Sequence, residues 1–337
     1  MIKIAFLIMN HRDPAQLLRL AGTLRLELPD APIIVHNDRF RVDFEPSVLE
    51  PLGNTHLLAN EKPLAWGSFE FVETYWRSVK WIDENVDFDW LVLLSSQDYP
   101  IKPLVDFAEH LAGTGANAMV LATPIDQIED KSDRRNRRRR YLYQYRRPAK
   151  PEPGGLEDNA RRWLRRHTAF LVDVLNNVQP FFQIYKYPDQ MPWRIGWRAR
   201  STPFSRSEPC WFGSSWITLS RHAAKVLVEN VNDRPDYVEY FRRTVLSDES
   251  ATNTLICNAP NVRTELVDSH YVRWTHATSG HPDIFSAKDL PELLARPECF
   301  ARKFDLNTDA EILDLLDDML AQARAAADRP VPEVRQS

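Results

Sequence analysis

The sequence has few of the residues that build small cross-linked or low-complexity proteins. It contains 3 cysteines and 10 glycines in 337 residues, and the cysteines lie far apart without a CxxC pair. An odd number of isolated cysteines argues against a disulfide framework and against a zinc site, and we expect a reducing compartment. Scarce glycine argues against a linker-rich chain. The length instead suits a sizeable core, in one large α/β domain or two smaller ones.

Long apolar runs are missing as well. No stretch approaches the roughly 20 residues that a membrane-spanning helix needs. The opening "MIKIAFLIMNHRD" has no small-residue cleavage site and is typical of a first strand and not of a signal peptide. We therefore expect a cytoplasmic protein. The net charge is −4, but arginines concentrate in "DRRNRRRRYLYQYRRPAK".

Strand-like and helix-like patterns alternate through the first part of the chain. Four apolar runs are typical of buried strands: "IKIAFLIM", "APIIVHND", "WLVLLS" and "AMVLATP". Apolar residues at helical spacing fill the stretches between them: "AQLLRLAGTLRLEL", "FEFVETYWRSVKWIDENV" and "LVDFAEHLAG". This alternation predicts an α/β fold with a mainly parallel sheet, helices on both faces, and a ligand site at the carboxyl ends of the strands.

The second half is less regular. Residues 126–200 are arginine-rich and interrupted by "PEPGG", which indicates an excursion from the core. Strand-like "CWFGSSWITLS" and "RTELVD" follow, with helical patterns near 221–231, 235–243 and 248–257. We expect one domain over 1–305, an amphipathic helix over 306–327 and a flexible tail over 328–337.

A metal clamp at a strand end is also lacking. "DFD" at 87–89 precedes its strand, where a solvated turn explains it, whereas a metal clamp belongs after the strand. The residues that do follow the strand are "SSQD", and Asp98 suits hydrogen bonding or fixing the loop better than holding a divalent ion alone. We therefore expect no metal cofactor and a different means of holding a diphosphate.

Other polar residues each have a functional and a structural interpretation. His36 and Asp38 end the second strand, where a doubly wound sheet binds a ribose or base, but turn formers also occur there. Glu249 follows Ser247, a natural N-cap, so a favourable helix dipole alone would explain that carboxylate.

The stretch "CFARKFD" interleaves cations with phenylalanines. Such anchored cations, Arg302 and Lys303, can neutralise a diphosphate, or can be ordinary surface charges beside a core. Tryptophans at four further positions could stack on sugars, although most tryptophans belong to cores or interfaces: Trp66, Trp211, Trp216 and Trp274.

The arginine-rich run raises the alternative of nucleic-acid binding, because Tyr143 and Tyr145 among arginines offer stacking beside phosphate contacts. The chain as a whole is acidic, however, and such runs are commonly mobile loops. We therefore expect no nucleic-acid partner. An anionic acceptor or an anionic membrane surface suits the run better.

Seven stretches occur in a specific order: "IIVHNDRF", "WGSFEFVE", "LLSSQDYPIKP", "GSSWITLSR", "SDESATNTLI", "YVRWTH" and "FARKFD". In this series the chain resembles the core-2/I-branching β-1,6-N-acetylglucosaminyltransferases and peptide O-xylosyltransferases, in particular bacterial members. The resemblance covers about residues 1–305 except 126–200. It implies a GT-A-type nucleotide-sugar fold, inversion at the anomeric carbon and activity without a metal, with basic side chains in place of the cation.

The resemblance also implies roles for single residues. Glu249 would be the catalytic base, Lys303 would contact the diphosphate, Asp38 would lie near the uridine, and Trp274 would lie at the acceptor side. We add further candidates around them. The predicted donor site comprises Asn10, His36, Asp38, Trp66, Gly67, Arg302 and Lys303, and the predicted acceptor site comprises Asp98, Ser214, Trp274 and His276.

The chain departs from the family pattern at three places. "ATSGHPDIFSAKDL" is shortened and has no second phosphate-binding arginine at the matching distance, so Arg302, Arg273 or His281 would have to compensate. Ser247 stands where a proline is common before the Asp-Glu pair. The acceptor loop of the family aligns poorly with 126–146, so the acceptor does not transfer.

From the sequence we predict an inverting, metal-independent glycosyltransferase that moves N-acetylglucosamine from UDP-N-acetylglucosamine to a hydroxyl of a glycan or glycoconjugate. UDP-xylose is the alternative donor. A non-catalytic nucleotide-sugar or glycan-binding protein on the same fold is the rival of another class, and donor turnover separates the two. We also hypothesise peripheral contact with the inner face of the membrane through the basic excursion.

Overall fold

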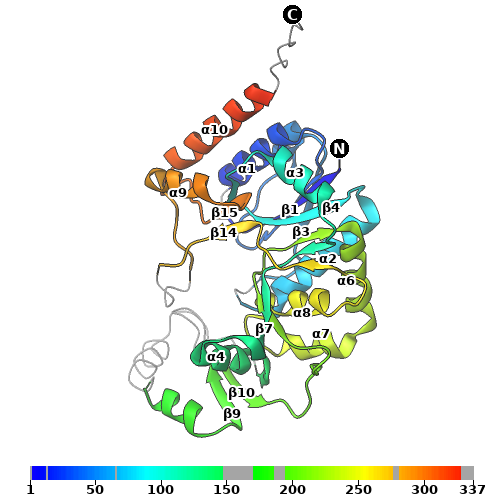
Figure 1. Ribbon diagram of the computed structural model, residues 1–337, viewed down its shortest axis with the longest axis vertical. Coiled ribbons are helices and arrows are strands. Elements are labelled where there is room, and N and C mark those ends of the chain that lie inside the picture. Colours follow the sequence, from blue (N-terminus) through cyan, green and yellow to red (C-terminus); the bar gives the residue numbers. More distant parts are fainter. Residues whose placement is uncertain are drawn as a thin grey trace, which may run out of the picture.

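The computed structural model describes residues 2–12, 14–64, 67–146, 170–185, 194–275 and 281–327. Its centre is a seven-stranded sheet with helices on both faces (Figure 1). The strands lie in the order β13-β6-β12-β4-β1-β2-β3. Their bounds are β1 Ile4–Asn10, β2 Ile33–Asn37, β3 Thr55–Ala59, β4 Trp90–Ser95, β6 Ala118–Met119, β12 Thr218–Ser220 and β13 Thr264–Glu265.

One strand of this sheet runs against the others. β1 pairs in parallel with β2 and β4, and β3 continues in parallel beside β2. β12 is antiparallel to both β4 and β6, while β13 is parallel to β6. The predicted mainly parallel sheet is therefore confirmed, with the single reversal at β12.

Two apolar clusters form the core, one on each face of the sheet. All seven residues of β1 are buried, which suits a strand covered on both faces. Ala5, Leu7 and Met9 contribute to one cluster, whereas Ile4 and the other even-numbered apolar residues of β1 contribute to the other. This alternation follows from the two-residue period of a strand.

The first cluster is shared with α2 Phe69–Asn85, α6 Arg221–Asp233, α7 Pro235–Arg242 and α8 Ala251–Cys257. The second is shared with α1 Pro14–Glu27, α3 Leu104–Gly113, α9 Leu290–Ala295 and α10 Glu311–Ala327. Short 3-10 turns complete the described elements: η1 Pro46–Leu52, η2 Ile125–Gln127, η3 Ser247–Glu249 and η4 Ala287–Asp289. No described helix has the length and apolar character that a membrane crossing requires.

Three smaller sheets flank the central one. β14 His270–Val272, β15 Phe300–Arg302 and β5 Asp98–Pro100 form the first, and β11 Trp211–Gly213 pairs with β7 Ala122–Pro124 in the second. The predicted strand "CWFGSSWITLS" is therefore two strands, β11 and β12, in different sheets. The third sheet has the order β8-β10-β9, with bounds β8 Tyr143–Tyr145, β10 Arg194–Arg198 and β9 Phe182–Tyr185.

The arginine-rich region forms a layer outside the core. The helix α4 Lys131–Tyr141 packs beside the sheet β8-β10-β9, and a helical segment covers 170–178. In Figure 1 this layer lies at the opposite end of the molecule from α10. The predicted excursion over 126–200 is thus a folded layer within the described residues, although 147–169 and 186–193 lie outside them.

The C-terminal helix is part of the core. α10 begins at Glu311, later than the predicted start at 306, and buries four apolar side chains, Ile312, Leu313, Leu316 and Leu320. Asp317 on its other side accepts hydrogen bonds from Arg19 at 2.7 Å and from Thr23 at 2.9 Å. The predicted tail over 328–337 lies outside the described residues.

Candidate active site

Polar side chains join the carboxyl ends of β1 and β2. The register pairs Asn10 with Asn37, and the Asn10 Nδ2 atom donates to the Asn37 Oδ1 atom at 2.9 Å. The Asp38 main-chain N–H donates to the Asn10 carbonyl at 2.8 Å, and Asn60 donates to the Asp38 Oδ1 atom at 2.7 Å. The predicted positions of Asn10 and Asp38 at this edge of the sheet are confirmed.

His36 is the residue before Asn37 in β2, and it is 5% exposed. Burial lowers the pKa of its imidazole to about 4, and its Nδ1 atom has no hydrogen-bond partner. The side chain is therefore neutral at physiological pH. It can serve a nucleotide as a hydrogen-bonding group and not as a cation.

Cations gather beside this edge. Lys303 is 9% exposed, and burial, followed by the charges of Arg12 and Arg302, lowers the pKa of its ammonium group to about 8. Burial and the charges of Arg41, Arg12 and Lys303 lower the pKa of His11 to about 4. Arg12 pairs with Asp305 at 2.8 Å. Arg12 thus lowers the pKa of both Lys303 and His11, and this positive environment favours an anionic ligand.

The chain holds Lys303 in place by main-chain bonds and buried aromatics. Phe300 and Phe304 on either side are fully buried, which confirms the anchoring expected from "CFARKFD". The Phe304 N–H donates to the Gln97 carbonyl at 2.9 Å, and the Phe285 N–H donates to the Lys303 carbonyl at 2.9 Å. No hydrogen bond to the Lys303 ammonium group occurs within the described part of the chain. The main chain at Lys303 is therefore fixed, and its ammonium group is available to a ligand.

Arg302 turns toward a buried carboxylate. In the small sheet it pairs with Asp98 across β15 and β5, and its Nε atom lies 3.7 Å from the Asp98 Oδ1 atom. Its guanidinium lies 4.1 Å from the Trp216 ring centroid. Asp98 is 0% exposed and accepts two hydrogen bonds of 2.7 Å from Ser95. This geometry favours the loop-fixing interpretation of Asp98, and the predicted ligand roles of both residues stay predictions.

Glu249 ends the three-residue turn η3. Leu246 before it has left-handed backbone angles, φ 49° and ψ 49°. The Leu246 N–H donates to the Gly67 carbonyl at 3.2 Å, and the Tyr141 hydroxyl donates to the Leu246 carbonyl at 3.1 Å. These bonds fix the turn from two other elements, so Gly67 lies against the segment that carries Glu249.

The predicted capping role of Ser247 is wrong. Its Oγ atom is buried without a hydrogen-bond partner, and no side chain caps this turn. The Ser250 N–H instead donates to the Ser247 carbonyl, because a three-residue turn satisfies its donors through the main chain. The capping by Ser247 is therefore lost, but α8 begins two residues after Glu249, so its N-terminus still favours a carboxylate there.

Two arginines of α4 bind the Glu249 carboxylate. Its Oε2 atom lies 2.5 Å from Arg140 and 3.5 Å from Arg137. Burial raises the pKa of Glu249, and the Arg140 charge opposes that rise. The side chain is still 31% exposed. Glu249 is thus a braced carboxylate with access to solvent.

Asp248 lies beside it in a buried position. The Ser215 hydroxyl donates to its Oδ2 atom at 3.0 Å, and burial raises the pKa of the Asp248 carboxyl. Asn253 then links the neighbouring strand connection to the turn, since its amide donates to the carbonyls of Ser214 at 2.9 Å and Glu249 at 3.1 Å. Ser214 is therefore close to Glu249, as its predicted place in the acceptor site requires.

Of the other predicted residues, the structure describes Trp274 and not Trp66 or His276. Trp274 is 52% exposed, which leaves its ring accessible. Trp66 and His276 lie outside the described residues. The structure thus brings Gly67 and Ser214 to Glu249. Its other described donor candidates lie at or beside the ends of β1, β2 and β15: Asn10, His36, Asp38, Arg302 and Lys303.

Sequence reasoning missed four site residues: His11, Arg12, Arg137 and Arg140. Arg12 stands two residues after the end of β1, a position that the fold class marks as functional. The signal for the arginines of α4 was their spacing of three, which places both on one helix face. Their partner Glu249 is 109 residues from Arg140, so no local pattern could identify it.

The carboxylates at the strand ends are engaged in hydrogen bonds. Both oxygens of Asp98 and the Oδ1 atom of Asp38 already accept hydrogen bonds. Over the described ranges, no group of three or more His, Cys, Asp or Glu side chains could hold a metal ion. Asp87 and Asp89 occupy the predicted turn before β4, where Asp89 accepts the Lys3 N–H at 2.7 Å.

Comparison with known proteins identifies the family. The model of the Core-2/I-Branching enzyme family matches residues 4–294. The chain belongs to this family. Membership confirms the predicted resemblance and, together with the sheet order, the GT-A-type α/β fold class.

Curated relatives are 23% identical to this chain over the aligned residues. β-Glucuronosyltransferase GlcAT14A of Arabidopsis thaliana is 23% identical over 345 residues, which cover 94% of this chain and 64% of that protein. Xylosyltransferase 1 of Homo sapiens is 23% identical over 343 residues, 94% of this chain and 30% of that protein. The chain thus spans less than two thirds of the length of these relatives.

Solved structures are less similar. TarS 1–349 of S. aureus in complex with UDP has a TM-score of 0.29 at 13% identity, covering 35% of each chain. Glucosyl-3-phosphoglycerate synthase of Mycobacterium tuberculosis, in complex with Mn²⁺, UDP and glucosyl-3-phosphoglycerate, has a TM-score of 0.30 at 14% identity. That similarity covers 71% of this chain and 67% of the other.

Proposed function

We propose that this family member is an inverting glycosyltransferase that moves a sugar from a UDP-sugar to a hydroxyl of a glycan or glycoconjugate. N-acetylglucosamine is the sugar we favour, and transfer proceeds without a metal. Two observations support this most: Glu249 is a partly exposed carboxylate held by two arginines, and Lys303 is a buried cation beside Arg12 and Arg302. The charge of Asp248, next to Glu249, acts on Arg302, next to Lys303.

The reaction is a direct displacement. Glu249 accepts the proton of the acceptor hydroxyl as that oxygen attacks the anomeric carbon from the face opposite the UDP. The bond from the anomeric carbon to the UDP oxygen breaks, and its electron pair leaves with the diphosphate. Lys303 and Arg12 stabilise that charge. Because attack and departure occur on opposite faces, the configuration inverts.

The ion pair with α4 leaves room for this role. Arg140 and Arg137 contact the Oε2 atom of Glu249, and the Oε1 atom has no hydrogen bond in the described structure. Oε1 can therefore accept the proton while Oε2 stays paired. The positive charges also favour the ionised carboxylate that a general base must present near neutral pH.

The donor sugar has more than one candidate. Two relatives bear the names β-glucuronosyltransferase and xylosyltransferase, so UDP-glucuronate and UDP-xylose are tested beside UDP-N-acetylglucosamine. A protein that binds nucleotide sugars without transferring them is the rival function. We retain cytoplasmic localisation and peripheral membrane contact as further proposals.

A UDP-release assay tests the function. Each UDP-sugar is incubated with the wild type without acceptor, so that slow hydrolysis reports cleavage. Glu249→Gln should lower release by about 10²-fold or more while UDP affinity and melting temperature change little, because Gln still accepts a hydrogen bond from Arg140. The matched control is Glu109→Gln, at an exposed glutamate of α3. UDP binding without release from any UDP-sugar would favour the rival function.

A further inference from the structure

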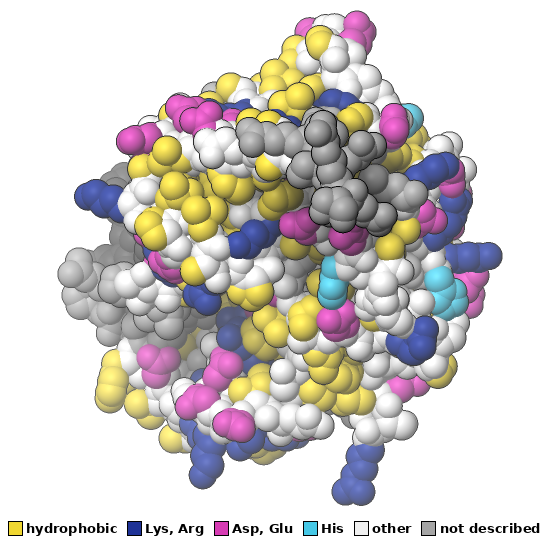
Figure 2. Space-filling model, turned by 45° about the horizontal axis from the view of Figure 1, so that its top comes forward, with side chains coloured by type: hydrophobic (Ala, Val, Ile, Leu, Met, Phe, Trp, Pro, Cys, Tyr) yellow, Lys and Arg dark blue, Asp and Glu magenta, His cyan; other side chains and the backbone are white. Residues whose placement is uncertain are grey.

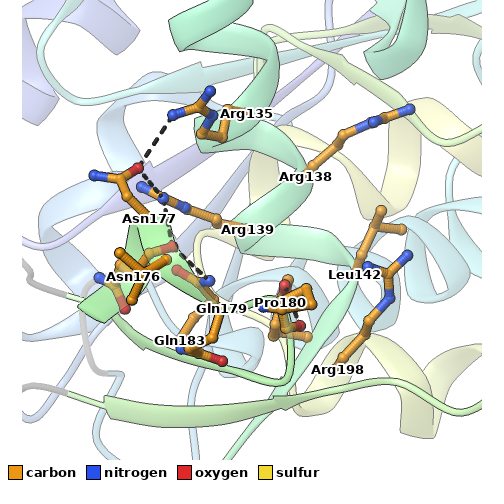
Figure 3. A pocket seen from close by; sticks show the side chains of 12 residues that line it. Arg135, Arg138, Arg139, Leu142, Asn176, Asn177, Gln179, Pro180, Gln183 and Arg198 are labelled. Carbon is orange, nitrogen blue, oxygen red and sulfur yellow. Dashed lines mark hydrogen bonds between the residues drawn. The ribbon is translucent and has the colours of Figure 1, made fainter. Parts of the chain in front are cut away.

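A cleft lies on the side of α4 that faces away from Glu249. It has a volume of about 330 Å³ and opens between α4, the helical segment 170–178 and the strands β8, β9 and β10 (Figure 3). Its lining includes four arginines, Arg135, Arg138, Arg139 and Arg198, and four side-chain amides, Asn176, Asn177, Gln179 and Gln183. None of the lining residues is an acid.

Neutral groups hold the arginines without cancelling their charge. Arg135 and Arg139 donate to the Asn177 Oδ1 atom at 3.1 and 2.9 Å, and Arg139 also donates to the Asn176 carbonyl at 2.8 Å (Figure 3). Burial, followed by the charge of Arg135, lowers the pKa of Arg139. Arg138 contacts the carboxylate of Asp126 at 2.8 Å, and the charge of Asp173 acts on Arg139, so two carboxylates face the four arginines within the described residues. The cleft therefore carries excess positive charge.

One face of α4 lines the cleft, and the other contacts Glu249. Positions 135, 138, 139 and 142 follow helical spacing and line the cleft, while Arg137 and Arg140 on the other side reach Glu249. A helix with its side chains is about 10–12 Å wide. The cleft is thus about one helix width from the proposed base.

We propose that this cleft binds an anionic group of the acceptor, a carboxylate, phosphate or sulfate, away from the hydroxyl that is glycosylated. The planar guanidinium matches such groups in a bidentate way. The volume lies at the lower end of small-molecule sites, which suits one charged substituent better than an extended nucleic-acid backbone. Placing the anion behind α4 also separates it from the negative charge of Glu249.

Direct binding measurements test the cleft. With the donor site saturated by UDP, trigalacturonate, inorganic phosphate and neutral maltotriose are titrated at low salt by calorimetry. The wild type should bind at least one of the two anions and not maltotriose. Arg198→Gln should weaken that binding about 10-fold, and among the described residues it breaks no side-chain hydrogen bond. Arg139→Gln should do the same, and Arg206→Gln, an exposed arginine outside the lining, should not.

The outcomes separate this inference from the function on which it rests. If the wild type does not bind UDP, the result counts against the proposed function. The anion titrations can then be run without UDP. Failure of both anions to bind, equal binding of maltotriose, or affinities unchanged in both cleft variants would overturn the inference. Binding to anionic phosphatidylserine vesicles that needs Arg198 and Arg139, without soluble-anion binding, would also overturn it in favour of a membrane contact.

Discussion

The environment of the Lys303 ammonium group disfavours its positive charge. The group is buried beside Arg12 and Arg302, and its pKa falls to about 8. A bound diphosphate supplies the missing negative charge and raises that pKa again. Ligand affinity and the protonation of Lys303 are therefore linked.

UDP affinity should accordingly depend on pH. Lys303 is charged below its pKa of about 8 and loses its charge above it, whereas the UDP phosphates stay ionised because their second pKa lies near 6. We expect UDP binding to weaken as pH rises through about 8. Lys303→Arg should abolish this pH dependence while keeping affinity, and Lys303→Met should weaken UDP about 10-fold at neutral pH. Calorimetric dissociation constants that stay flat with pH in the wild type would contradict the assignment.

The Glu249 carboxylate, unlike the Lys303 ammonium group, lies beside charges of the opposite sign. Burial raises its pKa, and Arg140 holds that rise in check. Removing the positive charge disfavours the ionised carboxylate, so Arg140→Gln should move the acid limb of the turnover–pH profile to higher pH. Arg206→Gln is the distant control. An acid limb that does not move in the Arg140 variant would show that another group titrates there.

At the residue scale, the sequence predicted the positions of Asn10 and Asp38 because each follows a recognisable apolar strand, and it predicted the anchoring of Lys303 from the phenylalanines around it. It did not predict the pairing of Arg140 with Glu249. That contact joins the small arginine-rich layer to a turn far along the chain, and only the tertiary fold brings them together.

At the scale of elements, the turn before α8 shows where local rules failed. Ser247 has the right chemistry for a cap, but the left-handed Leu246 and the bond to Gly67 set the backbone instead. The neighbouring strand β11 supports α8, since the Ser250 hydroxyl donates to the Trp211 carbonyl at 2.7 Å. The placement of Glu249 thus depends on the pairing of β11 with β7.

Two glycines test this dependence. A Cβ atom at Gly213 would lie 2.0 Å from the Leu121 carbonyl oxygen and 2.6 Å from the Ala122 Cα atom, both main-chain atoms that cannot move aside cheaply. Gly213→Ala should therefore lower the free energy of unfolding by about 1–3 kcal/mol and reduce turnover. Gly22→Ala in α1 has no atom within 4 Å of its Cβ and should raise stability by about 0.5–1 kcal/mol. Equal melting temperatures for the two variants would refute this account.

At the scale of the whole molecule, periodicity was enough to predict the α/β class and the parallel half of the sheet. It did not predict the reversal at β12 or the separation of β11 from β12, because strand order depends on long-range pairing. Figure 2 shows basic and acidic side chains interspersed over the face that it presents. The overall charge of the chain therefore did not locate either the Lys303 cluster or the arginine cleft.

The proposed diphosphate site neutralises its ligand with side-chain cations. Both oxygens of Asp98 accept hydrogen bonds from Ser95. Asp38 accepts one from Asn60 and lies 3.5 Å from Arg41, so both carboxylates already have protein partners. UDP release should then persist in EDTA and gain little from Mn²⁺, whereas raising the salt from about 0.05 to 0.5 M should weaken UDP binding, because ions screen partly exposed charges. A strict Mn²⁺ requirement, together with salt-insensitive binding, would instead mean that a metal and not Lys303 neutralises the departing UDP.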